Sequence, residues 1–164
     1  MDSFLASSLY GKSFIKYRIN NSRNDRKRFS RTAKNNENDI PVVIDSINET
    51  ISKELAGPNA TRYKRNGMEY NFNKELVIED LLYEVKTRVK TLDSSKILRI
   101  GLENGKILEN TDKLGDLYEK YKDTNDDILY LLLTQESSVY AYIISLLKYF
   151  FGLKTWTYFF THDF

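Results

Sequence analysis

Cysteine is absent from this chain of 164 residues, and histidine occurs only once, as His162. Without cysteine there can be no disulfides, thiolate metal sites or thiol nucleophiles. A Ser-His-Asp triad or a histidine-rich metal site would depend on His162 alone, near the end of the sequence, where chains are usually frayed. The sequence therefore predicts a protein that is not an enzyme and that uses no metal and no cofactor.

Glycine and proline are also scarce, with seven and two residues. The glycines are scattered and form neither GxGxxG nor GxxxxGK, the loops that hold nucleotide phosphates. We therefore expect no small-molecule substrate.

The charges are unevenly distributed, although the net charge is only +2. Residues 1–40 contain nine Lys and Arg against four Asp and Glu, whereas residues 41–164 contain more acidic than basic residues. Between 20 and 38 the only large apolar side chain is Phe29, too little to offset the entropy of ordering the segment. We therefore predict that residues 1–40 form a basic, mostly disordered N-terminal tail.

Several roles fit this tail. Many charge runs are merely solvated, but a basic tail is also suited to nuclear import or to an anionic surface such as lipid. The candidate arm for an anionic surface consists of Arg26, Lys27, Arg28 and Arg31. Nucleic acid is disfavoured as a partner because no aromatic residues alternate with the basic residues of this cluster. Residues 1–24 hold one acid, Asp2, which is also typical of a mitochondrial presequence.

Beyond residue 40 the sequence has the pattern of a folded domain. β-Branched residues over 42–47 and alternating apolar residues over 68–72 each predict a strand. The polar stretch 48–66 between them predicts a long connection. Helical spacing predicts the main helix over 75–92, with Asn73 as its N-cap.

Two further strands are predicted in the second half of this domain, over 97–102 and 128–133. Between them we expect a short strand at 107–108 and a turn or short helix over 114–121. The order is strand, strand, helix, strand, short strand, short helix, strand.

Three segments within this order resemble the ubiquitin-like β-grasp family. Residues 105–110 read Gly-Lys-Ile-Leu-Glu-Asn, are followed by Leu114, and are similar to the fourth-strand region of that family. Residues 127–133 are similar to its last strand, and residues 77–81 to the start of its helix. The resemblance spans 41–135 and implies an α+β fold in which a mixed sheet packs on one main helix.

The resemblance also has implications for function. Conjugated members of the family end in Gly-Gly soon after the last strand, whereas this chain reads Thr-Gln-Glu-Ser-Ser over 134–138 and continues. It therefore resembles a recognition domain and not a conjugated tag. Ras-association domains share much of the topology and are an alternative.

Alternation along the last strand predicts a partner-binding surface. If Leu129, Leu131 and Leu133 pack on the helix, then Tyr130 and Leu132 face outward. The candidate contact residues are Tyr130 and Leu132, together with Leu98 or Ile100 on the neighbouring strand. The alternative is that another part of the same chain, most obviously the C-terminal segment, covers them, because exposed apolar patches seldom remain uncovered.

The C-terminal segment, residues 136–164, is predicted to contain a hydrophobic helix. Residues 139–160 are the most apolar part of the chain, and 22 residues are long enough to span a bilayer. Lys148 near the centre makes autonomous insertion energetically marginal. Four interpretations remain: the helix spans a membrane, lies on one, docks to a partner, or packs on its own domain. The docking candidates are Tyr142, Ile143, Leu146, Leu147, Phe150, Phe151 and Trp156.

Together these features predict a non-catalytic adaptor for protein-protein interaction. Its ubiquitin-like domain would be tethered to an intracellular membrane, at the cytosolic face, or to a membrane-bound complex. The alternative is a soluble structural subunit of a larger complex, with the C-terminal segment buried by a partner. A mitochondrial location is the alternative for the compartment.

Overall fold

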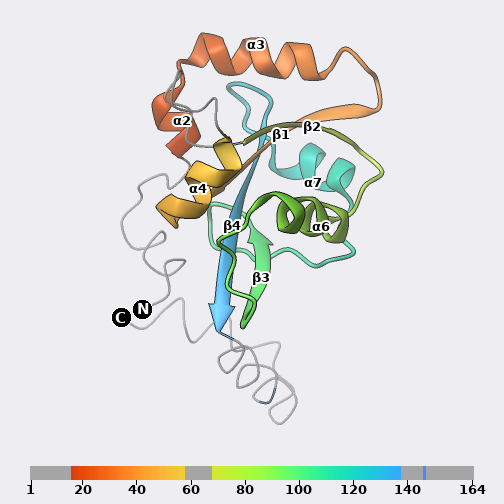
Figure 1. The fold of residues 1–164 in the computed structure, drawn as a ribbon. Helices are drawn as coiled ribbons and strands as arrows, with labels where there is room; N and C mark the ends of the chain where they lie inside the picture. Colours follow the sequence, from red (N-terminus) through yellow and green to blue (C-terminus); the bar gives the residue numbers. More distant parts are fainter. Residues whose placement is uncertain (1–15, 58–67, 138–145, 147–164) are drawn as a thin grey trace, which may run out of the picture.

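The computed structural model describes residues 16–57, 68–137 and 146, and it contains a four-stranded sheet with helices on both faces (Figure 1). The strands are β1 (Asp39–Ser46), β2 (Met68–Asn73), β3 (Lys96–Gly101) and β4 (Leu129–Ser137). Their order in the sheet is β2-β1-β4-β3, with β1 and β4 parallel and the other pairs antiparallel. The predicted mixed sheet is therefore confirmed, as is the adjacency of the strands predicted over 97–102 and 128–133.

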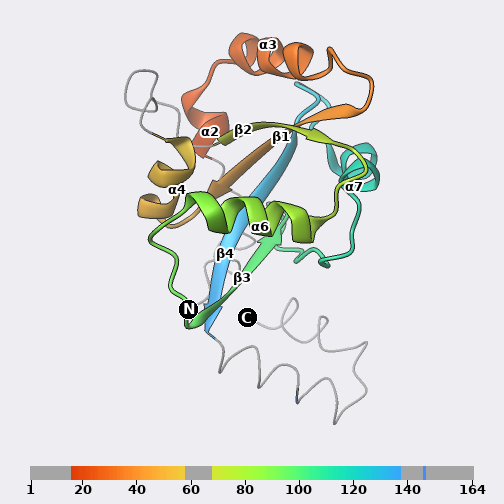
Figure 2. The same cartoon turned by 45° about the vertical axis from the view of Figure 1, so that its right-hand side comes forward.

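One face of the sheet packs against the main helix, α6 (Ile78–Arg88), as predicted. Ile78, Leu81, Leu82 and Val85 are buried on the inner side of α6, at helical spacing. The short helices α4 (Glu49–Ala56) and α7 (Leu114–Tyr121) extend the same apolar cluster. Figure 2 shows α6 lying across β3 and β4, with α4 and α7 on either side of it.

The main helix begins at Ile78, three residues after its predicted start. The segment before it pairs instead with the segment before α7: Ile78 N donates to Asp112 O at 3.1 Å, and Leu114 N donates to Leu76 O at 2.9 Å. This pairing occupies backbone groups that a helix would need. Asn73, predicted as the N-cap, caps a turn by accepting a hydrogen bond from Glu75 N.

Helix α4 lies within the stretch predicted as a polar connection. The Asn48 side chain caps it, accepting hydrogen bonds from the N–H groups of Thr50 and Ile51. Ile51 and Leu55, four residues apart, are buried against the core. Gly57 ends the helix with a φ of 72°, a conformation that favours glycine.

The opposite face of the sheet is covered by α2 (Lys16–Asn20) and α3 (Arg23–Ala33), which we call the α2–α3 cover (Figures 1 and 2). The prediction of a mostly disordered tail over 1–40 is therefore wrong for residues 16–40, and residues 1–15 lie outside the described residues. Ser22 caps α3 by accepting a hydrogen bond from Asp25 N. Beneath the cover lies a second, smaller apolar cluster, formed by Tyr17, Val43, Ile128, Tyr130 and Leu132, with Phe29 packed at its border.

Candidate functional site

The outer edge of β2 is the most open edge of the sheet in the described part of the chain. Lys74 N donates to Asn38 O at 2.8 Å, so Asn73 and its partner Asp39 form a non-hydrogen-bonded pair. By alternation Asn71, opposite Pro41, lies in another such pair. The N–H and C=O groups of Asn71 consequently point away from β1, where an extended peptide could pair with them.

The opposite edge, on β3, is partly occupied. Leu108 N donates to Ile100 O at 2.9 Å, and Leu102 N donates to Lys106 O at 2.8 Å. The segment that follows β3 thus folds back and pairs with the C-terminal half of this strand. At the other end of β3 stands the exposed Lys96, a charge of the kind that protects edge strands from pairing.

Two aromatic side chains on β2 lie beside its open edge, on the α6 face. The rings of Tyr70 and Phe72 stack with centroids 4.5 Å apart, and the Arg88 guanidinium carbon lies 5.5 Å from the centroid of the Tyr70 ring. Burial raises the pKa of Tyr70 to about 12, against the opposing effect of Arg88. Phe72 is only partly buried, so it leaves apolar surface next to the edge.

Helix α3 contacts β2 from the other face and carries the predicted anionic-surface residues. Arg28 and Arg31 are exposed and Lys27 is half-buried, so a basic face is present, on a helix and not on a disordered arm. Arg26 departs from the prediction, because its guanidinium points inward. Its Nε lies 2.7 Å from Asp126 Oδ2, and the Asp126 side chain is fully buried.

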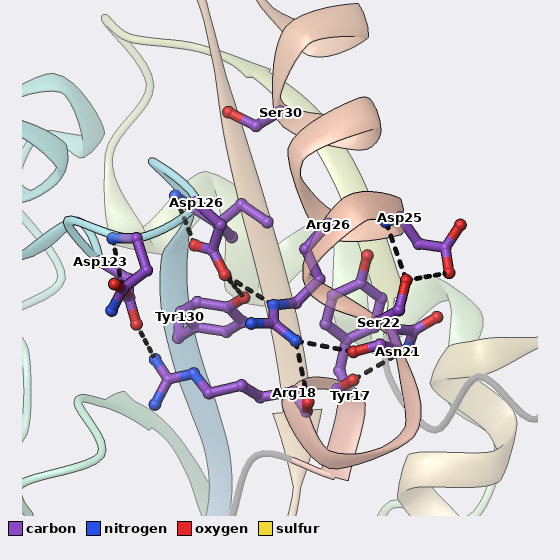
Figure 3. A network of polar contacts seen from close by, with 12 residues as sticks. Tyr17, Arg18, Asn21, Ser22, Asp25, Arg26, Ser30, Asp123, Asp126 and Tyr130 are labelled. Atoms are coloured by element: carbon purple, nitrogen blue, oxygen red, sulfur yellow. Dashed lines mark hydrogen bonds and ion pairs between the residues drawn. The ribbon is translucent and has the colours of Figure 1, made fainter.

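Arg26 is the centre of a polar network between the cover and the sheet (Figure 3). Besides the Asp126 pair, its Nη1 donates to the backbone oxygens of Arg18 and Asn21 at 3.1 and 2.7 Å. The Tyr130 hydroxyl donates to the same Asp126 oxygen at 2.8 Å. Burial, followed by the contact with Asp126, raises the pKa of Tyr130.

Arg18 and Lys34 form two further ion pairs with the turn that contains Asp126. Arg18 contacts Asp123 at 3.0 Å and Glu103 at 2.8 Å, and its guanidinium carbon lies 4.1 Å from the centroid of the Tyr130 ring. Lys34 Nζ lies 3.1 Å from Asp127 Oδ2. We call residues 123–127 the acidic turn, because each of its three aspartates forms an ion pair with a basic residue of the N-terminal segment.

The predicted partner-binding residues do not form one exposed surface. Tyr130 and Leu132 point away from α6 as predicted, but they are 5% and 1% exposed because the α2–α3 cover lies on them. Leu98 and Ile100 lie on the other face, with the main core. Ile100 is directly opposite Leu133, and opposed residues in an antiparallel pair share a face.

The predicted docking residues of the C-terminal segment lie outside the described residues, apart from Leu146. Leu146 is helical and 36% exposed. Within the residues that the structure describes, no helix has the length and apolar character needed to cross a bilayer. The C-terminal hydrophobic helix therefore stays a prediction. The residues outside the description are Tyr142, Ile143, Leu147, Phe150, Phe151 and Trp156.

Two observations on the described residues bear on a catalytic or metal centre. A hollow of about 240 Å³ lies between α2 and the turn after β3, lined by Arg18, Glu103, Tyr121, Asp123 and Tyr130 among others. Both of its carboxylates pair with Arg18. No group of three or more His, Cys, Asp or Glu side chains suited to a metal occurs among the described residues.

Two parts of the site were not found from the sequence. The open edge at Asn71 depends on strand order, which the alternation over 68–72 does not reveal. The acidic turn had a visible signal, since the basic N-terminal segment and the acidic remainder are complementary in charge.

No protein-family model matches the sequence, and no curated protein matches it. Solved structures do match. Trypanosoma brucei ATG8 is 18% identical, with a TM-score of 0.58, and the alignment covers 74% of this chain and 95% of that one. Plasmodium falciparum Atg8 in complex with a P. falciparum Atg3 peptide is 17% identical, with a TM-score of 0.52 over 71% of this chain and 93% of that one. The likeness shows that the chain has the ubiquitin-like β-grasp fold.

Proposed function

We propose that this protein is a non-catalytic adaptor that binds an extended peptide of a partner protein along the free edge of β2. The observation that carries the proposal is the outward orientation of the Asn71 N–H and C=O groups on a strand that pairs, among the described residues, only with β1. Adding a strand to such an edge is a recurring mode of peptide recognition, in which the main chain supplies the hydrogen bonds.

The surroundings of the edge favour particular side chains in the peptide. The partly buried Phe72 offers apolar contact on the α6 side. The exposed Arg28 and Arg31 lie on α3, which touches β2 from the other side, and would favour acidic residues in the partner. The P. falciparum Atg8 complex with an Atg3 peptide supports peptide binding by a protein of this fold.

Attachment to an intracellular membrane is a finer part of the proposal, and it rests on the sequence of residues 139–160. Carbonate extraction of membranes from the native cell tests whether this attachment is by a spanning helix, because only a protein that spans the bilayer should resist extraction. Release of the full-length protein by carbonate would favour a peripheral or partner-bound segment instead.

The variant Asn71→Pro tests the edge directly. Proline removes the outward N–H of residue 71 and the side-chain hydrogen bond from Asn71 to Asp39, but it leaves the backbone hydrogen bonds between β1 and β2 in place. Proline is also tolerated on edge strands. We expect the variant, purified from native cells as a tagged full-length chain, to lose partners that the wild type retains.

Two controls separate loss of the edge from loss of the side chain or of the fold. Asn71→Ala removes the same side chain and keeps the N–H, so it should retain the partners. Circular dichroism and thermal unfolding should show that Asn71→Pro is folded. If folded Asn71→Pro retains every partner of the wild type, the proposal is wrong.

A further inference from the structure

Ser30 is a buried hydroxyl side chain on α3, a helix that otherwise carries many charged residues. It lies on the inner side of α3, is 3% exposed, and donates from Oγ to Asp127 O at 3.3 Å. In the sequence it directly follows Arg26, Lys27, Arg28 and Phe29. Basic residues two and three positions before a serine are what basic-directed protein kinases select.

We propose that Ser30 is a phosphorylation site that becomes accessible when the α2–α3 cover opens, and that phosphate on Ser30 keeps the cover open. The kinase would transfer the γ-phosphoryl group of ATP to Ser30 Oγ. The bond between that phosphorus and the bridging oxygen of ADP breaks, a bond to Oγ forms, and the hydroxyl proton leaves to solvent. This regulation goes beyond peptide binding at β2 and does not depend on it.

The closed structure has no place for a phosphate at this position. Phosphoserine carries about two negative charges at neutral pH. The hydroxyl is buried beside the acidic turn, where Asp126 is fully buried and already paired with Arg26, and Asp127 is paired with Lys34. A dianion placed here would lose its hydration and lie against the backbone oxygen of Asp127, in a turn that already carries two carboxylates, and this opposes docking of α3.

Opening of the cover is a local event that need not unfold the domain. The cover contributes one buried side chain, Tyr17, and the partly buried Phe29 to the small cluster. Beyond these residues, the cover is attached through the small buried side chain of Ala33 and through a polar network that centres on Arg18 and Arg26. The main core lies on the other face of the sheet and contains no residue of α2 or α3.

In vitro phosphorylation of the full chain tests the proposal. The probe is the catalytic subunit of cAMP-dependent protein kinase with ATP, with the modified residue identified by mass spectrometry. The opened variant is Asp123→Asn with Asp126→Asn, which leaves the sequence around Ser30 unchanged and can keep the hydrogen bonds these side chains accept within the turn. The matched control is Asp116→Asn, an exposed carboxylate on α7.

We expect Ser30 to be phosphorylated about tenfold or more faster in the double variant than in the wild type, as a shift of ~1.4 kcal/mol in the opening equilibrium requires. Asp116→Asn should match the wild type. Ser30→Ala should abolish this incorporation, whereas Thr32→Ala, which removes an exposed hydroxyl two residues away, should not. Hydrogen exchange of the phosphorylated wild type should then be fast over 23–33 and unchanged over 78–88.

Three results would overturn the proposal. The first is an unmodified Ser30 in a double variant whose α3 amides exchange rapidly. The second is equal phosphorylation rates in the wild type and the double variant, whether or not the α3 amides stay protected in the double variant. The third is a Ser30-phosphorylated protein in which α3 exchanges as slowly as in the unmodified chain.

Discussion

The two faces of the sheet are covered in physically different ways. On the face that packs against α4, α6 and α7, twenty buried apolar residues of the described part of the chain form one continuous cluster. On the other face the cluster has five buried residues, and Tyr17 is the only one of these that comes from the cover. The hydrophobic effect therefore stabilises the first face, whereas the second needs additional interactions.

Ion pairs supply those interactions on the second face. Arg18, Arg26 and Lys34 pair with successive aspartates of the acidic turn, and the exposure of the pairs rises from the Arg26 pair to the Lys34 pair. The difference teaches that the two layers on a single sheet can be held by different forces, one mainly by apolar burial and the other largely by ion pairs. Each prediction below tests this contrast, from the largest expected effect to the smallest.

Truncation in the apolar core should have the largest effect. Leu81→Ala removes a fully buried side chain of α6 from the centre of the main cluster. We expect a loss of about 3 kcal/mol in the free energy of unfolding, within the usual range for buried leucine. Urea denaturation measures it, and Tyr83→Ala on the same helix is the control, because Tyr83 is 72% exposed. Equal losses for the two variants would contradict the assignment of the core face.

Removal of Arg26, the centre of the polar network under the cover, should lower the free energy of unfolding less and act more locally. Arg26→Met leaves the Asp126 carboxylate buried without its guanidinium partner, and we expect a loss of ~2 kcal/mol, typical of a buried charged hydrogen bond. Hydrogen exchange should accelerate in α2 and α3 and change little in α6. Arg23→Met, at an exposed position on the same helix, should do neither. A uniform acceleration over both helical layers would show that the cover and the core unfold as one unit.

The strands and the main helix could be predicted because their signals are local. Alternation marks β2, β-branched residues mark β1, and helical spacing marks α6. The start of α6 could not be predicted in this way, since residues 74–78 pair with a segment that lies more than thirty residues later in the sequence.

The cover was missed for the same physical reason. Its helices contain too few apolar residues to fold by themselves, and the carboxylate that holds Arg26 lies 100 residues away. The face of Leu98 and Ile100 was likewise undetermined, because it depends on the register that places Ile100 opposite Leu133. Charge complementarity between distant segments was the one available signal for the cover.

Titration should distinguish the buried phenol of Tyr70 from the half-buried phenol of Tyr121, which accepts a hydrogen bond from Lys106. Burial raises the pKa of Tyr70 to about 12, whereas an unfolded chain releases the proton around its ordinary value of 10.0. As the pH rises, the unfolded chain therefore loses this proton before the folded protein does. The free energy of unfolding consequently falls between pH 10 and pH 12. Tyr70→Phe should weaken this loss of stability.

The absorbance of phenolate measures the same titration in the folded protein. Tyr70→Phe should remove a step near pH 12. The control is Tyr121→Phe, which should remove a step below the ordinary value, because a hydrogen bond from Lys106 lowers the pKa of Tyr121. If both tyrosines titrate together near pH 10, Tyr70 is not buried as described.

The smallest effect should come from the most exposed ion pair of the cover. The Lys34 and Asp127 side chains are 38% and 51% exposed, so water and salt screen their attraction. Lys34→Met should cost about 0.5 kcal/mol or less, as is usual for surface pairs, and the cost should vanish at high salt. Arg26→Met should keep most of its larger cost under the same conditions, because the Asp126 carboxylate is fully buried. Urea denaturation at low and high salt compares the two variants, and a Lys34 effect as large as that of Arg26 would show that docking of the cover depends on charge alone and not on burial.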